Sequence, residues 1–312
     1  MRLFPVLLAL ACTAGPDTDT DPLEPPPWPD GQTVRLESVI IGVPNGMALG
    51  PDFLAVGAAG RTLRLNPAVE AVTGDVEAQP NYPEEVVAAG RKGTADVALV
   101  RTPTDLRLVA FDPAPGGISD FFDQREVRFA TWTGTQVLDQ YRYEATQCGL
   151  RWMHQEDPII EGLDCGEITM SVVDEDTVVV GLGRDGVLWV DQTAATTIAS
   201  DGLFVAWDAK QRLVWHAVAG ETWVAAVTPE GEEVRRVQAG DAIQALTALG
   251  DRGEIVWSEN TLAGSRLVRA DGEGTPLESL DSERSIVGLD SDPAGTRIAV
   301  QRTGDVGTYV MD

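Results

Sequence analysis

The sequence predicts an all-β fold in which groups of short strands repeat along the chain. Apolar runs of strand length recur at steps of about 42 residues, and one step has about twice that length. No stretch shows the 3.6-residue period of a long helix, and 32 glycines and 19 prolines interrupt the chain at strand-length intervals. The runs are 53–56, 97–100, 178–180, 213–215, 255–257 and 298–300.

A second series of apolar segments follows each run by about ten residues and ends in a polar or proline-containing turn. A period near 42 residues with four short strands per unit is typical of a β-propeller blade. An antiparallel sandwich is the alternative, but its strands would not repeat in groups. The second series comprises residues 63–67, 108–113, 188–191, 224–229, 267–271 and 309–312.

The spacing predicts a single propeller of seven four-stranded blades over residues 32–312. The last unit has only three strands, and residues 33–39 form one extra strand before the first unit. We therefore expect residues 33–39 to be the outer strand of the last blade, which would close the ring. Six or eight blades remain possible, because the third unit is inferred from spacing alone. The units start near residues 40, 85, 128, 167, 202, 242 and 285.

Residues 1–12 have the features of an export signal. Arg2 precedes a short apolar run that is too short to span a bilayer. The end of this run, Ala9-Leu10-Ala11-Cys12, resembles a bacterial lipobox, in which Cys12 would be lipidated and become the mature N-terminus. The usual pattern has leucine where this sequence has Ala9, and the alternative is an ordinary cleaved signal with an incidental cysteine. Thr13 follows the cysteine in place of aspartate, which favours the outer membrane.

Residues 13–31 are rich in proline, aspartate and threonine and have almost nothing to bury. Such a composition predicts a solvated, extended linker between a lipid anchor and a folded domain. Asp17, Asp19 and Asp21 imitate the start of a calcium-binding loop. However, Pro22 and Trp28 occupy the positions where that loop needs glycine and glutamate, so the linker is the better interpretation.

The chain is strongly acidic, with a formal net charge of −26 from 49 acidic and 23 basic side chains. Nucleic-acid binding requires clustered Lys and Arg, so we expect no nucleic-acid partner. A basic amphipathic helix on a membrane surface is excluded for the same reason. Such a surface favours a basic partner or divalent cations.

Two segments resemble known propeller families. Residues 290–312, with an Asp-Pro-Ala-Gly turn, an Ile-Ala-Val run and a final Tyr-Val-Met-Asp, resemble the WD40-like repeat of TolB-type propellers. Residues 43–52, which contain Pro44-Asn45-Gly46, look like a segment of gluconolactonase-type and other six-bladed propellers. The second resemblance implies a divalent metal, such as calcium, held around a central channel by a Glu, an Asn and an Asp. Asn45 is then the candidate metal ligand, although an Asn-Gly pair more commonly forms a turn.

Cys148 and Cys165 are the cysteines that remain after Cys12, and an exported protein favours a disulfide between them. Two free thiols are the alternative. A hairpin that turns near Asp157 would bring the two cysteines together on paired strands. The expected pairs are Cys148 with Cys165, Leu150 with Leu163, and Trp152 with Glu161.

The two histidines do not indicate catalysis. His154 lies near the tip of the expected hairpin, and His216 ends a repeat strand at a position that other units fill with Gly181, Ser258 or Gln301. We expect both to be ordinary surface or half-buried residues, because no serine or cysteine nucleophile with a recognisable motif accompanies them.

Five tryptophans fall at corresponding places in the predicted strands. Their large apolar surfaces suit packing between blades, and an aromatic-lined ligand site is the alternative. These residues are Trp189, Trp207, Trp215, Trp223 and Trp257.

These observations favour a cell-envelope lipoprotein whose propeller is a binding scaffold for a protein or a small ligand, with no catalytic residues and no cofactor assigned. We expect it to be exported and anchored through Cys12 in the outer membrane. The alternative is a metal-dependent hydrolase or lactonase of the six-bladed type, with Asn45 and bound calcium.

Overall fold

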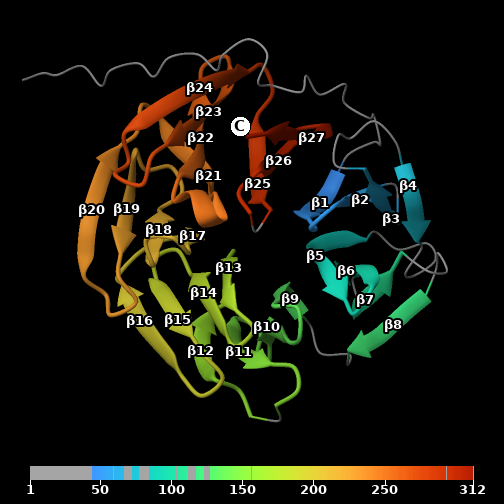
Figure 1. Ribbon diagram of the computed structural model, residues 1–312. Coiled ribbons are helices and arrows are strands. Elements are labelled where there is room, and N and C mark those ends of the chain that lie inside the picture. The colour runs from blue at the N-terminus through green and yellow to red at the C-terminus, as the bar shows by residue number, and fades with distance from the viewer. Residues whose placement is uncertain are drawn as a thin grey trace, which may run out of the picture.

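Seven antiparallel sheets are arranged as blades around a central axis (Figure 1). This computed structural model describes residues 44–58, 60–66, 72–76, 84–102, 105–111, 117–122, 127–155, 157–292 and 294–311. It confirms the predicted all-β fold and the single seven-bladed propeller. Within the described residues the one helix is the short 3-10 turn Gly250–Arg252, and none is long and apolar enough to cross a membrane.

In each blade the strands follow one another from the axis outward in chain order. The innermost strands start within a few residues of the predicted unit starts. Blade 1 comprises β1 Pro44–Leu49, β2 Leu54–Ala58, β3 Arg61–Leu65 and β4 Val72–Val76; blade 2 comprises β5 Glu85–Lys92, β6 Ala95–Arg101, β7 Leu106–Ala110 and β8 Gly117–Phe122. Blade 3 comprises β9 Val127–Trp132, β10 Val137–Arg142, β11 Gln147–Trp152 and β12 Ile160–Asp164; blade 4 comprises β13 Thr169–Asp174, β14 Thr177–Gly181, β15 Val187–Val190 and β16 Ala195–Ala199. Blade 5 comprises β17 Phe204–Asp208, β18 Leu213–Ala217, β19 Trp223–Val227 and β20 Glu233–Gln238; blade 6 comprises β21 Ala242–Ala248, β22 Ile255–Thr261, β23 Gly264–Ala270 and β24 Pro276–Ser282; blade 7 comprises β25 Ile286–Ser291, β26 Arg297–Arg302 and β27 Asp305–Val310.

Blade 7 has three strands among the described residues, as its sequence predicts. The fourth strand expected from residues 33–39 lies outside the described residues. So do Cys12 and the linker 13–31.

Seven hydrophobic clusters fill the seven interfaces between neighbouring blades. Side chains alternate between the two faces of a strand. Each second strand contributes side chains to the clusters on both sides of its blade, so both of its faces are buried. In β2, Leu54 and Val56 pack towards blade 7, whereas Ala55 packs towards blade 2. Burial on both faces explains why the repeated runs are continuously apolar and lack a polar alternation.

Blade 1 packs directly against blade 7 and thereby closes the ring. Leu54 and Val56 share a cluster with Ala299 and Val306. The backbone N–H of Leu49 donates a hydrogen bond of 2.7 Å to Oδ2 of Asp290. We call this contact between the first and last blades the seam.

The strands β11 and β12 form the predicted hairpin, and Cys148 and Cys165 are joined by a disulfide with a Cα–Cα distance of 5.1 Å. The predicted strand register was wrong. A bulge between Cys148 and Leu150 shifts the pairing, and Cys165 lies one residue beyond β12. The observed pairs are Gln147 with Asp164, Cys148 with Leu163, and Leu150 with Ile160.

The tryptophans do not all occupy equivalent positions. Trp215 and Trp257 both fill the interface between blades 5 and 6, but from opposite sides: Trp215 packs towards the next blade, whereas Trp257 packs towards the preceding one. Trp189 and Trp207 are half-buried and meet edge to face at 5.5 Å between blades 4 and 5. Trp223 is half-buried on the third strand of blade 5.

Candidate functional site

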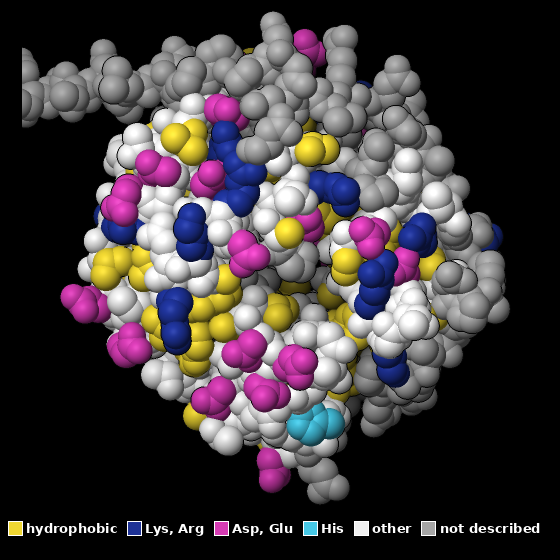
Figure 2. All heavy atoms as spheres, viewed as in Figure 1, with side chains coloured by type: hydrophobic (Ala, Val, Ile, Leu, Met, Phe, Trp, Pro, Cys, Tyr) yellow, Lys and Arg dark blue, Asp and Glu magenta, His cyan; other side chains and the backbone are white. Residues whose placement is uncertain are grey.

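The innermost strands of all seven blades surround a cavity of about 480 Å³ on the axis. Figure 2 shows it as the hollow at the centre of one face. Acidic and basic side chains are spread over this face, and several acidic ones lie together below the hollow in this view. The cavity is a concave site whose chemistry depends on the first strand of each blade.

One residue from each first strand forms a ring around the cavity, which we call the channel ring. Each member pairs with a second-strand residue that packs towards the next blade, so all seven occupy the same place in the repeat. All seven line the cavity. The members, from blade 1 to blade 7, are Ala48, Ala88, Thr131, Ser171, Ala206, Thr247 and Asp290.

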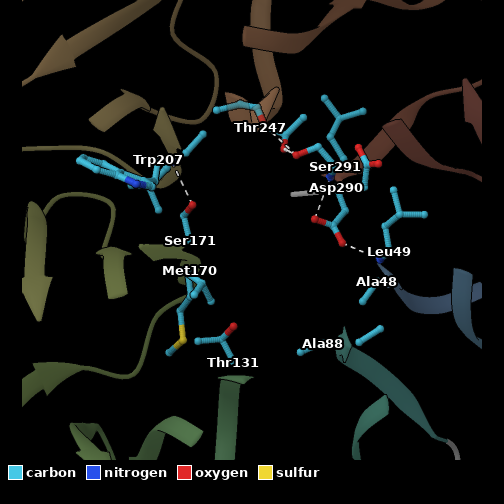
Figure 3. A pocket seen from close by; sticks show the side chains of 18 of the residues that line it. Ala48, Leu49, Ala88, Thr131, Met170, Ser171, Trp207, Thr247, Asp290 and Ser291 are labelled. Carbon is cyan, nitrogen blue, oxygen red and sulfur yellow. Dashed lines mark hydrogen bonds between the residues drawn. The ribbon is translucent and has the colours of Figure 1, made fainter. Parts of the chain in front are cut away.

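The channel ring is built from small side chains with one exception. Alanine, serine and threonine leave the axis open, whereas longer side chains would fill it. Asp290 of β25 is the charged member, and Figure 3 shows it on the wall opposite Thr131 and Ser171. The channel therefore has one carboxylate side and one hydroxyl side.

Two backbone N–H groups hold the Asp290 carboxylate. Leu49 donates to Oδ2 at 2.7 Å, and Ser291 donates to Oδ1 at 2.9 Å. The carboxylate keeps some exposed surface because it faces the channel, but protein surrounds it. This desolvation raises the pKa of Asp290 to about 6. The two backbone hydrogen bonds lower the pKa and so oppose the rise, whereas the charge of the nearby Asp292 adds to it.

Asp292 also borders the cavity, but its two oxygens accept three hydrogen bonds within its own turn. Oδ1 accepts the backbone N–H groups of Thr296 and Arg297 at 2.7 and 2.9 Å. Oδ2 accepts the Thr296 hydroxyl at 2.6 Å. Asp292 therefore shapes the β25–β26 turn and leaves Asp290 as the carboxylate available to the channel.

The hydroxyls of the channel ring link neighbouring blades. Ser171 Oγ accepts the backbone N–H of Trp207 at 3.0 Å. Thr247 donates to Ser291 Oγ at 3.1 Å, and Ser291 in turn donates to the Ala248 carbonyl at 2.6 Å. These bonds fix the positions of the side chains, and Ser171 retains its own O–H proton for a further partner.

Asn45 does not line the cavity. Its amide nitrogen donates to the Glu84 carbonyl at 2.9 Å, which joins blades 1 and 2. Asn45 and Gly46 form a bulge in β1 and not the tight turn that the Asn-Gly pair suggested. Within the part of the chain that the structure describes, no three His, Cys, Asp or Glu side chains are placed to hold a metal ion.

Neither histidine lines the cavity. His154 is exposed in the β11–β12 connection, as predicted. His216 is only 1% exposed, so the expectation of a surface or half-buried residue was wrong. It lies on the face of β18 that packs towards blade 4, at the position where β14 has Val180, and its ring meets Trp223 edge to face at 5.7 Å. Burial lowers the pKa of His216, so the ring is neutral.

Sequence reasoning missed the channel ring. Each member precedes the middle of its blade's buried run by seven to eleven residues, and an aligned comparison of these positions would have isolated Asp290 among alanines, serines and threonines. The residue fell within the segment that resembled a TolB-type repeat, but nothing in that resemblance marked it as a site.

Comparison with known proteins supports the fold alone. No protein-family model matches the chain, and no curated protein matches it. Among solved structures, 1347 chains match, so the architecture is too widespread to assign a function. One of them, from the structure titled "Crystal Structure of Mitotic Checkpoint Complex", has a TM-score of 0.69 and 13% sequence identity, with 99% of each chain covered. The chain thus has a WD40-like β-propeller fold.

Proposed function

We propose that this protein is a binding module of the cell envelope, lipid-anchored through Cys12 in the outer membrane, and that the central channel is its binding site. The observation that carries this proposal is the cavity of about 480 Å³ enclosed by all seven first strands. Ligand sites in proteins are typically concave, preformed and of about 300–1,000 Å³. The small residues of the channel ring keep this space open.

The fold supports the same interpretation. The structural neighbour comes from a structure that its title describes as a complex, and WD40-like propellers suit the role of a rigid interaction scaffold. The net charge of −26 favours a positively charged ligand or a basic partner protein, and it disfavours nucleic acid.

Two matched substitutions test whether the channel is the site. Val172 lies on β13, borders the cavity and is 37% exposed. Val234 lies on the outer strand β20 and is 44% exposed. Val172→Trp should therefore obstruct the channel without disturbing a packed interface, whereas Val234→Trp adds the same bulk away from it.

The experiment compares the full chain and both variants by chemical crosslinking in envelope fractions and by thermal-shift screening against small-molecule extracts. We expect crosslinked partner proteins, or compounds that raise the melting temperature, with the wild type and with Val234→Trp. Neither should be found with Val172→Trp. Equal behaviour of all three proteins would reject the channel as the binding site.

The metal-dependent hydrolase stays a separate prediction. It requires stoichiometric metal in the purified protein and turnover of a small ester or lactone. Elemental analysis after equilibration with micromolar calcium, together with an esterase assay, tests it independently of the crosslinking experiment.

A further inference from the structure

The chemistry of the channel ring specifies a ligand class. Resting on the proposed binding function, we propose that the channel binds a small aliphatic amine, with its ammonium group against Asp290 and a second polar group at the hydroxyl side formed by Thr131 and Ser171.

Asp290 provides an uncompensated negative charge. Its two oxygens accept one backbone hydrogen bond each, from Leu49 and Ser291, and each oxygen can accept another. No ion pair involves Asp290 among the residues that the structure describes. A desolvated carboxylate without a cation is costly to the fold, and an ammonium ion in the channel would relieve that cost through a charge-assisted hydrogen bond.

The opposite wall suits the other end of such a ligand. Thr131 and Ser171 come from blades 3 and 4, which lie across the seven-bladed ring from blade 7. The Ser171 hydroxyl already accepts from Trp207 N–H and can donate to a ligand oxygen or nitrogen. Ala48 and Ala88 give an apolar wall for a short carbon chain between the two polar sides, and Met170 lies between Ser171 and Thr131 on the hydroxyl side (Figure 3).

A divalent metal fits the channel ring less well. Calcium takes six to eight oxygen ligands, usually with several carboxylates. The channel ring supplies one carboxylate, and three hydrogen bonds hold the Asp292 carboxylate in its own turn. An organic ammonium ion needs one counter-charge and a few hydrogen-bond acceptors, which the ring offers.

Binding should depend on the charge of Asp290. The neighbouring segments that line the channel, Met47–Leu49 of β1 and Leu246–Ala248 of β21, contribute no titratable side chain, and Asp292 is the charged group nearby on the same strand. Protonation of Asp290, with its pKa of about 6, removes the charge that holds the ammonium group. Affinity should therefore fall as the pH is lowered from 7.5 to 5.

Isothermal titration of the full chain at pH 7.5 tests the proposal, with 5-aminopentan-1-ol as the probe and pentane-1,5-diol as its uncharged counterpart. We expect Asp290→Asn to weaken binding of the amine by roughly tenfold or more, and the diol to bind no better to the wild type than to the variant. Asp251→Asn is the matched control. It removes an exposed carboxylate next to Gly250 at the cavity and should change affinity less than about twofold, the effect of one exposed charge.

Each other outcome overturns a defined part of the proposal. Amine binding that is lost in Val172→Trp but kept in Asp290→Asn would leave the channel as a site and reject the ammonium chemistry. Calcium that binds in place of the amine, with the same dependence on Asp290, would assign the site to an inorganic cation. A short lysine peptide that binds more tightly than the amine would assign it to a partner protein. Thermal melting of each variant establishes that it is folded.

Discussion

Asp290 combines two properties that oppose each other at the level of a single residue. Its carboxylate is held between blades 7 and 1, where burial disfavours the charged form, yet the charge is what a cationic ligand would need. Residues that serve binding often reduce the stability of the unliganded fold.

This conflict predicts a pH-dependent effect of Asp290→Asn. The folded-state pKa of about 6 exceeds the ordinary aspartate value of 3.8, so Asp290 favours the folded state at low pH and loses that contribution as the pH rises through about 6. Relative to the wild type, the variant should gain roughly 2 kcal/mol in free energy of unfolding between pH 4 and pH 8. Urea denaturation at both pH values measures this. A constant difference between the two proteins would show that Asp290 ionises normally.

His216 gives the opposite dependence. Its folded-state pKa is lowered below 6.5, so its contribution to stability is present above pH 6.5 and is lost as the unfolded chain takes up the proton at lower pH. The stability advantage of the wild type over His216→Gln should therefore shrink between pH 8 and pH 5, measured by urea denaturation. His154→Gln, at an exposed position, is the control for the loss of a histidine side chain that is not buried.

Neither residue was predictable as important from the sequence. His216 was assigned to a surface because small and polar residues fill its column in other blades. In the structure these residues do not share a face: Gly181 faces the following blade, where an added Cβ would lie 2.2 Å from the Leu203 carbonyl oxygen, whereas His216 is buried on the side of the preceding blade. Asp290 was one acid among 49, and only the geometry of seven strands distinguishes it.

At the level of elements, the sequence drew attention to the Asn45-Gly46 pair in β1 but suggested a tight turn there, whereas the structure has a bulge. Gly46 has a φ of +75°, and an added Cβ would lie 2.1 Å from the Val86 carbonyl oxygen of blade 2. The pairing of β1 with β2 is irregular between Pro44 and Met47, so the bulge brings this segment close to the neighbouring blade.

Gly46→Ala should therefore destabilise the protein by roughly 3 kcal/mol or more, because it combines backbone strain with a steric overlap. Gly93→Ala is the matched control. Gly93 also has a positive φ, +64°, but an added Cβ would meet nothing within 4 Å, so the cost should be about 1 kcal/mol. Thermal unfolding of both variants measures the difference. Equal losses would show that backbone strain alone accounts for the effect.

The strands themselves were largely predictable, because buried runs are continuous and turns are marked by glycine, proline and aspartate. The register of β11 with β12 was not. A symmetric hairpin from Cys148 to Cys165 ignores the bulge next to Gly149, where a side chain would approach the Ile160 carbonyl to 2.8 Å. Such local shifts depend on backbone contacts that a residue pattern does not encode.

At the level of the whole molecule, the repeat period was sufficient to predict seven blades. Each unit must bury both faces of its sheet against neighbours, so every unit needs a similar pattern. The central channel was not predictable in the same way, because its lining comes from seven first strands spread over about 240 residues and has no local motif.

Membrane attachment is also a property of the whole chain and remains a prediction. We expect wild-type protein expressed in a bacterium to partition with membranes and to incorporate labelled palmitate, whereas Cys12→Ala should do neither. Two acyl signals are usually needed for stable anchoring. Wild-type protein recovered in the soluble periplasmic fraction, without label, would favour the ordinary cleaved signal.

The seam has a consequence for how the chain reaches its final form. Six of the seven interfaces join blades that are neighbours in sequence, but Leu49 and Asp290 are 241 positions apart. The apolar face of blade 1, with Leu54 and Val56, therefore stays uncovered until blade 7 is in place. A contact of such long range makes folding slow, and unfinished chains expose this face to one another. Association of folding intermediates should begin there, at the two ends of the ring.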